Sequence, residues 1–115
     1  LTGARFTNAD LGADLKNQSM GLMRADLTSA KAEGADFKGA NLLRAVLEFA
    51  DLKGARFDRA NLTTASLAGA NLTGASVAGA VFTDTDVASA RLVDLVGLDE
   101  TRLDAASNLS RAITR

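Results

Sequence analysis

Several side chains that commonly carry catalysis are absent from this sequence. It contains no His and no Cys, so disulfides, thiolate–metal sites and imidazole acid–base chemistry are excluded. Trp and Tyr are also missing, and the aromatic residues are five Phe. Because the large side chains that fill an ordinary core are scarce, the composition favours a thin, stacked architecture of small residues.

The chain also lacks an excess of charge of either sign. Thirteen basic and fourteen acidic residues give a net charge of −1, so no long-range field would draw the protein onto nucleic acid or an anionic membrane. Neither a signal peptide nor an apolar run of about eighteen residues is present. The sequence begins at Leu1 inside its own repeat, which indicates a processed or truncated chain. We expect a cytoplasmic protein, or a periplasmic or lumenal one if a signal was removed.

What the sequence does contain is a period of five residues. Every fifth residue from Leu22 to Leu92 is apolar, and the residue two places earlier, from 25 to 90, is Ala in thirteen of fourteen cases. Thr85 is the exception. This period fits neither a helix nor a plain strand, but it fits a short strand followed by a turn. The first and third residues of each unit then point inwards, the second and fourth point outwards, and the fifth, often Gly, turns the corner.

The charged residues indicate how many units make one turn. Residues one turn apart lie above each other at about 4.8 Å, so opposite charges should coincide there. Within the regular array from Leu22 to Leu92, four pairs at a separation of twenty residues are opposite and one is alike, whereas at fifteen all four pairs are alike. Four units per turn are therefore predicted. The resulting charge ladders pair Lys31 with Asp51, Glu33 with Lys53, Asp36 with Arg56 and Lys38 with Asp58.

Units such as Ala25-Asp26-Leu27, Ala40-Asn41-Leu42 and Ala60-Asn61-Leu62 resemble the A(D/N)LXX pattern of the pentapeptide-repeat family. The resemblance covers residues 1 to about 94. It implies an all-β solenoid, a right-handed quadrilateral parallel β-helix with four pentapeptides per coil. It does not specify a function, because the family spans many unrelated roles.

The array departs from its period near the N-terminus. Leu11 and Leu22 are eleven residues apart rather than ten. Because Ala13-Asp14-Leu15 still matches the repeat, we expect a bulge or small loop over residues 16–21, within a β-helix domain of residues 1–97. A tolerated insertion is a simpler interpretation than a functional loop.

A second departure follows Leu92, where the period stops. Residues 98–115 read as a short α-helix with Asp99 as its N-cap. Because the end of a solenoid exposes strand edges and an apolar core, we expect this helix to cap the last coil. In several family members the C-terminal helical segment also mediates dimers, so the resemblance implies a homodimer through this end. Helical spacing places the capping residues Ala105, Ala106, Leu109 and Ile113 on one face.

No arrangement of residues indicates an enzyme. Catalysis needs paired groups in a concave pocket, whereas the Ser and Thr residues fall mostly on outward or corner positions, with no base placed beside them. Asp84 and Asp86 form an isolated DxD pair on a convex surface, which is typical of solvated carboxylates. We expect no catalytic residue, no metal and no cofactor.

Function must then lie on the outer surface. Two of its faces carry the charge ladders, and a third holds Asp26, Glu48 and Asp86 with no basic residue. Exposed apolar patches often mark partner surfaces, although scattered exposed apolar residues are also ordinary. The candidate partner surface consists of the outward apolar residues Met23, Leu43, Val46 and Phe49.

The leading hypothesis is a non-catalytic interaction or structural module that presents a rigid rod to a protein partner, with neither nucleic acid nor membrane as its target. The sequence does not identify that partner. The resemblance implies an alternative, since some family members mimic DNA, bind DNA gyrase and protect it from fluoroquinolones. That mimicry depends on a strongly negative surface, which a net charge of −1 does not supply.

Overall fold

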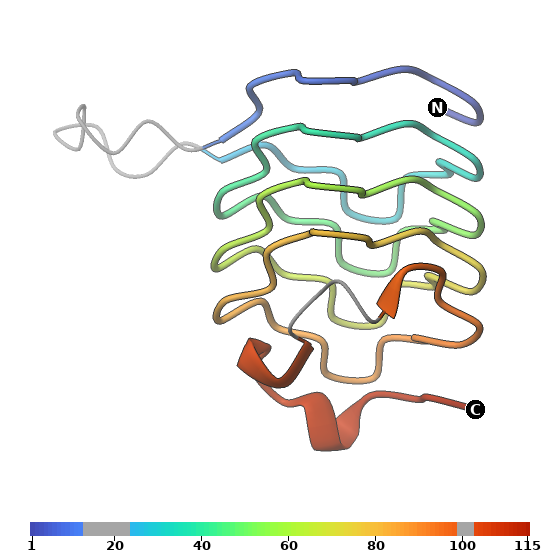
Figure 1. Cartoon of the computed structure of the whole chain (residues 1–115), viewed down its shortest axis with the longest axis vertical. Coiled ribbons are helices and arrows are strands. Elements are labelled where there is room, and N and C mark those ends of the chain that lie inside the picture. Colours follow the sequence, from blue (N-terminus) through green and yellow to red (C-terminus); the bar gives the residue numbers. More distant parts are fainter. Residues whose placement is uncertain (13–23, 99–102) are drawn as a thin grey trace, which may run out of the picture.

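The computed structural model describes residues 1–12, 24–98 and 103–115. Within them the chain winds as a stack of four-sided coils (Figure 1). Bridges between neighbouring coils are parallel, and most join residues twenty apart, such as Asp36 with Arg56. This register matches the spacing that the charges indicate. We number the sides by their bridge residues: side 1 holds Asp36 and Arg56, side 2 Asn41 and Asn61, side 3 Val46 and Ser66, and side 4 Asp51 and Asn71.

Units with Asp or Asn at the second position close their turn with two local hydrogen bonds. The C=O of the third residue accepts from the N–H three residues later, as in Leu62 with Ala65 (2.9 Å). The second residue, Asp or Asn, accepts from the N–H two residues later, as Asn61 does from Thr63 (3.1 Å). An Asx turn of this kind stabilises a bend without help from distant residues. Asp and Asn therefore recur at the second position because they hold the corner.

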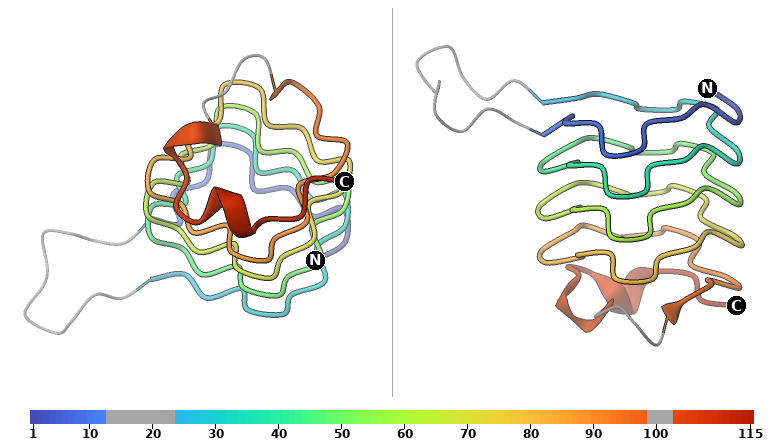
Figure 2. Two further views of the ribbon diagram at one scale, coloured as in Figure 1. Left: turned by 90° about the horizontal axis from the view of Figure 1, so that it is seen from below. Right: turned by 45° about the horizontal axis from the view of Figure 1, so that its top comes forward.

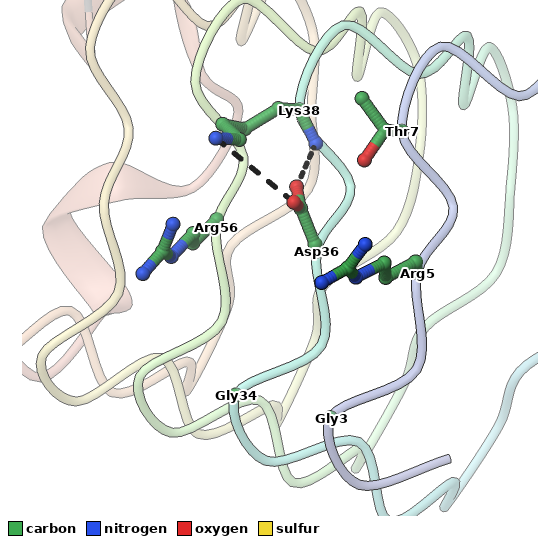
Figure 3. A pocket seen from close by; sticks show the side chains of 7 residues that line it. All are labelled: Gly3, Arg5, Thr7, Gly34, Asp36, Lys38 and Arg56. Carbon is green, nitrogen blue, oxygen red and sulfur yellow. Dashed lines mark hydrogen bonds and ion pairs between the residues drawn. The ribbon is translucent and has the colours of Figure 1, made fainter.

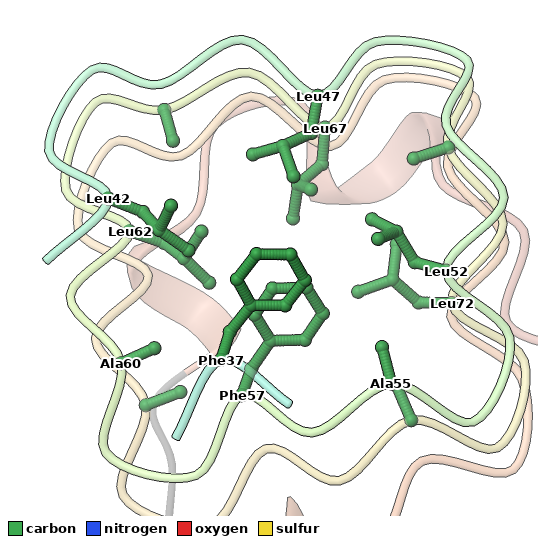
Figure 4. Packing of buried hydrophobic residues seen from close by; sticks show 14 of the residues in the cluster. Phe37, Leu42, Leu47, Leu52, Ala55, Phe57, Ala60, Leu62, Leu67 and Leu72 are labelled. Carbon is green, nitrogen blue, oxygen red and sulfur yellow. The ribbon is translucent and has the colours of Figure 1, made fainter. Parts of the chain in front are cut away.

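The inward residues of all four sides form a narrow core (Figure 4). The rings of Phe37 and Phe57 are stacked with centroids 5.1 Å apart, and Phe6 stacks on Phe37 at 5.0 Å. Thr85, the exception in the Ala positions, is also buried and donates its hydroxyl to the C=O of Leu62 at 2.6 Å. Its polar group is therefore satisfied inside an apolar core.

The first coil joins the second with a longer separation. Arg5 bridges to Asp36 and Asp10 to Asn41, in both cases 31 residues apart, which is eleven more than the twenty that separate Asp36 from Arg56. A single added residue would give a separation of only 21. The small bulge expected in an otherwise continuous array is therefore wrong, because the observed separation requires eleven added residues. Residues 13–23, which include the expected irregularity at 16–21, lie outside the described residues.

The described part of the C-terminal segment contains no α-helix. It forms two 3₁₀ turns, η2 (Leu103–Ala105) and η3 (Leu109–Arg111), and lies across the end of the solenoid (Figure 2). The N–H of Ser107 donates to the C=O of Thr85 at 2.7 Å, a residue of the preceding coil. Because such bonds replace those of an α-helix, the helix expected over 98–115 is wrong for residues 103–115, and its expected N-cap, Asp99, lies outside the described residues.

The inward side chains of this segment recur every three residues, as 3₁₀ turns require. Ala106 and Leu109 pack against the core as expected. Ile113 does not, since 39% of its surface is exposed. Ala105 is not among the residues packed against the core either, and its C=O accepts from the N–H of Asp84 at 2.9 Å. The residues of the segment that cover the core are Leu103, Ala106, Leu109 and Ala112.

Gly97 marks the point where the regular coils end. Its φ is +81°, and an added Cβ would lie 2.7 Å from the Cβ and 2.9 Å from the Cα of Ala78. We predict that Gly97→Ala lowers the free energy of unfolding by about 1–3 kcal/mol, because two backbones would have to separate. Urea denaturation would measure the loss. Gly54→Ala is the control, since Gly54 has a φ of +65° but open space around its Cα, and equal losses would contradict the close approach.

Candidate interaction surface

Phe49 is the most exposed large apolar side chain of the described residues, with 66% of its surface accessible. It occupies the fifth position of its unit, between sides 3 and 4, with a φ of +59°. A left-handed conformation costs a residue with a side chain about 1–2 kcal/mol, and it is unusual for a bulky one. The conformation itself belongs to the repeat, since Arg44, Arg59 and other corner residues share it, so what distinguishes Phe49 is an exposed aromatic side chain at that position.

The ring of Phe49 lies against the next coil. A Cβ added to Gly69 would be 2.5 Å from its Cδ1 and 2.6 Å from its Cε1. The ring therefore covers Gly69, and a larger residue at 69 would displace it. An aromatic side chain held in this way is a rigid contact group that loses little conformational freedom on binding.

The other predicted members of the partner surface are not equivalent to Phe49. Val46 is half-buried on side 3, in the same unit as Phe49. Leu43 is also half-buried, but it lies on side 2, beyond the corner formed by Arg44. Met23 lies outside the described residues. The structure thus places Val46 and Phe49 in the same unit and Leu43 on a different side.

Side 3 also carries carboxylates that hydrogen bonds hold in place. Glu48 Oε2 accepts from the hydroxyl of Ser66 at 2.7 Å. Asp86 Oδ1 accepts from the side-chain amide of Asn108 at 2.9 Å and from the N–H of Ala88 at 3.0 Å. The bond from Asn108, and then that from Ala88, lower the pKa of Asp86 below its ordinary value, although partial burial opposes them. Asp86 is therefore ionised at neutral pH and ties the C-terminal segment to the coil above it.

We predict that this tie weakens in acid. Because folding lowers the pKa of Asp86, its contribution is present above the ordinary value of 3.8 and is lost as the pH falls through the lower folded value. Asp86→Ala should reduce the free energy of unfolding by about 1 kcal/mol at pH 7, and this loss should shrink as the pH falls below 3.8. Thermal unfolding over this pH range would measure the change. Glu33→Ala removes an exposed carboxylate, and a similar pH-dependent loss in this control would contradict the assignment.

A hollow of about 440 Å³ opens on side 1 near the N-terminus (Figure 3). At its centre Asp36 Oδ1 accepts from the N–H of Lys38 at 2.9 Å, and Oδ2 lies 4.0 Å from the Lys38 Nζ. The backbone bond is the main reason that the pKa of Asp36 is lowered. The side chain of Thr7 also hydrogen-bonds to Asp36, so the hollow gathers charged and polar groups. Its lining residues are Gly3, Arg5, Thr7, Gly34, Asp36, Lys38 and Arg56.

The predicted charge ladders are in register, with Lys31 bridged to Asp51 and Asp36 to Arg56. An ion pair at 4.0 Å, however, joins Asp36 to Lys38 of the same unit. The exposed pairs of the ladders therefore contribute little to stability, although Oδ1 of the ladder residue Asp58 is buried without a hydrogen-bond partner.

Metal and membrane sites have no support in the described residues. Among them, no group of three or more acidic side chains is placed to hold a metal ion. Asp86 of the DxD pair is engaged with Asn108, and Asp84 is exposed. No helix in the part of the chain that the structure describes has the length and apolarity needed to cross a membrane.

Comparison with known proteins addresses the fold. The family model described as pentapeptide repeats matches residues 22–59 and 60–94 in eight copies. A search of curated proteins gave no match. Among solved structures, the chain is similar to a pentapeptide repeat protein from the cyanobacterium Cyanothece 51142, with 22% identity over 99% of this chain and 90% of that chain, and a TM-score of 0.37.

Two further structures are similar. A pentapeptide repeat protein from the Arabidopsis thaliana thylakoid lumen is 28% identical over 83% of this chain and 66% of that chain, with a TM-score of 0.39. Full-length QnrB1, a plasmid-mediated fluoroquinolone resistance protein, is 15% identical over 99% of this chain and 67% of that chain, with a TM-score of 0.50. At this identity the last similarity concerns the fold alone.

Proposed function

Because this chain belongs to the pentapeptide-repeat family, we propose that it is a non-catalytic interaction module that presents side 3 and the corner at Phe49 to a partner protein. The observation that carries the proposal is the Phe49 ring, which is 66% exposed at a corner position that other units fill with small or polar residues. Folding does not need an aromatic there, because Gly69 occupies the same corner one coil below.

Energetics favour this corner over the charge ladders as the centre of an interface. Burying an apolar side chain of this size contributes about 1.5–3 kcal/mol before the costs of association. Ladder residues would have to lose water for a small net gain. Val46, in the same unit as Phe49, adds apolar surface, and the residues around the ring exclude water from it.

The proposal includes a rigid rod. A right-handed winding, as the resemblance implies, would give side 3 a fixed orientation along the stack. A capping role for the C-terminal segment would keep the rod from extending by end-to-end association. The packing of Leu103 and Leu109 against the core supports the cap.

Site-specific photocrosslinking tests the proposal. With p-benzoylphenylalanine in place of Phe49, we expect a discrete crosslinked partner in cells that produce the protein, and none from the same probe in place of Lys53 on side 4. Identical products from both positions, or none from either, would overturn the proposal.

With that partner purified, Phe49→Ala should weaken binding about tenfold or more, as loss of an anchor residue does. The free energy of unfolding should change by no more than about 0.5 kcal/mol, because most of the ring is exposed. Calorimetric titration and urea denaturation would measure the two effects. A large loss of stability with unaltered binding would show that Phe49 serves its own chain.

The alternative, a mimic of DNA that protects gyrase, makes a different prediction. It requires protection of gyrase supercoiling from a fluoroquinolone by stoichiometric protein. We expect none, because the net charge is −1 and sides 1 and 4 carry both signs. Sedimentation of the wild type and of Phe49→Ala would show whether the chain forms a homodimer and whether that dimer depends on Phe49.

A further inference from the structure

Residues 66–69, on the coil that follows Phe49 towards the C-terminal end, form a floor of small side chains below the Phe49 ring. Glu48 leans onto this coil through its bond to Ser66, and the Phe49 ring leans onto Gly69. The N–H of Phe49 donates to the C=O of Ala68 at 3.0 Å. Ala68 therefore lies between Ser66, the contact of Glu48, and Gly69, the contact of the Phe49 ring. A carboxylate and an aromatic ring therefore stand over one short segment, residues 66–69.

The charges at the outward positions of side 3 around this floor are of one sign. Glu48 stands on the coil above it, and Asp86 is bridged to Ser66 on the coil below. The nearby cations lie off the outward positions of side 3: Arg44 at its opposite corner, Lys53 on side 4, and Arg111, whose C=O accepts from the N–H of Ser89 and whose charge helps to lower the pKa of Asp86. Among the described residues, the outward positions of side 3 carry no Lys or Arg: they are Asp26, Thr28, Val46, Glu48, Ser66, Ala68, Asp86 and Ala88.

An aromatic ring beside fixed carboxylates has a defined binding chemistry. The face of the ring attracts a cation, and the carboxylates pair with the same cation. Small residues on the floor leave room for the methylene stem of a long side chain, which packs on apolar surface while its charged end stays near water. Neither an acidic nor a purely apolar side chain would satisfy Glu48 here.

We propose that Phe49 and Glu48 form a binding site for an Arg or Lys side chain carried by an extended segment of the partner protein. The cationic group lies over the Phe49 ring and pairs with Glu48, and the stem lies across Ala68 towards Asp86. This inference rests on the proposed function, because it gives the chemistry of the partner at the same corner.

A peptide titration tests the site without the partner. The probe is a capped pentapeptide with a central arginine between alanines, and its control has citrulline, which keeps the shape and removes the charge. In ¹⁵N spectra of the whole chain, the arginine peptide should shift the amides of Phe49, Ala68 and Gly69, and the citrulline peptide should bind at least threefold more weakly. Phe49→Ala and Glu48→Gln should each weaken the arginine peptide about two- to fivefold. Glu33→Gln, the same change of charge on side 4, should not.

Equal binding of the two peptides, or equal effects of Glu48→Gln and Glu33→Gln, would overturn the inference, and so would shifts centred on the hollow of side 1. Shifts of the Phe49 amide on dilution of the free protein would also overturn it, since a second copy would then occupy the site. If a partner is crosslinked through position 49 but the titration fails, the cation site is wrong and the proposed function stands. If the titration succeeds but no partner is crosslinked, the cation site stands and the proposed function is wrong.

Discussion

Leu42→Asp is expected to unfold the solenoid, whereas Leu43→Asp, one residue further along, leaves it folded. Leu42 is fully buried on side 2 and belongs to the same inward column as Leu62, while Leu43 is half-buried and points outwards. Loss of a buried Leu costs about 2–5 kcal/mol. A buried carboxylate without a partner costs several more, against a total stability of about 5–15 kcal/mol.

Far-UV circular dichroism and urea denaturation of the two variants would measure the difference. The comparison is closely matched, because the substitution is the same and both residues lie in one unit. Leu43→Asp should lose no more than about 1 kcal/mol, as its side chain keeps water on one side. Similar losses in both variants would contradict the inward and outward assignment of the whole array, since every unit follows the same alternation.

The core and the register of the stack are predictable from the sequence for a physical reason. Each unit repeats the same local turn, so a residue and its neighbour one coil away are always twenty positions apart in the regular region. Opposite charges at that separation, such as Lys31 with Asp51, therefore indicate the coil length directly. The sequence did not reveal why Asn61 and its equivalents recur, because the Asx turn is visible only once the N–H of Thr63 is located.

The two ends were not predictable in the same way. Near the C-terminus the separation grows to 21 between Asp86 and Ser107, and to 22 between Arg91 and Ile113. Inward residues three apart, such as Leu109 and Ala112, also satisfy an α-helical pattern over so short a stretch. The turn bond from the N–H of Ala112 to the C=O of Leu109 shows that the segment reuses the local turn of the units rather than a helix.

The candidate site was partly accessible to sequence reasoning. Phe49 stands out because an aromatic occupies a corner position otherwise held by small or polar residues. Its contact with Gly69 follows from the separation of twenty, and this signal is present in the sequence. The hydrogen bond between Asp86 and Asn108 joins residues 22 positions apart and depends on the irregular last coil, so no fixed period could have predicted it.

The C-terminal segment provides the second large expected effect. Removal of residues 98–115 would uncover Val87 and Leu92, which are 0% and 5% exposed in the whole chain. It would also leave the N–H groups of both residues without the C=O partners that Ser107 and Ile113 supply. An open parallel edge over an apolar core is a template for another chain. We therefore expect the shortened chain to aggregate or to stack end to end, with a lower melting temperature.

Size-exclusion chromatography with light scattering and thermal unfolding would measure both effects, and two point variants locate their origin. Leu109→Ala removes a side chain packed against the core and should cost about 1–2 kcal/mol, because Leu109 is half-buried. Ile113→Ala removes a side chain that is 39% exposed and lies outside that packing, so it should cost less than half as much.

If the shortened chain stays monodisperse with unchanged melting, the segment does not cap the solenoid. If Ile113→Ala is the more damaging substitution, the segment instead contacts the last coil through the α-helical face on which Ile113 lies, and the three-residue spacing of its inward side chains is wrong.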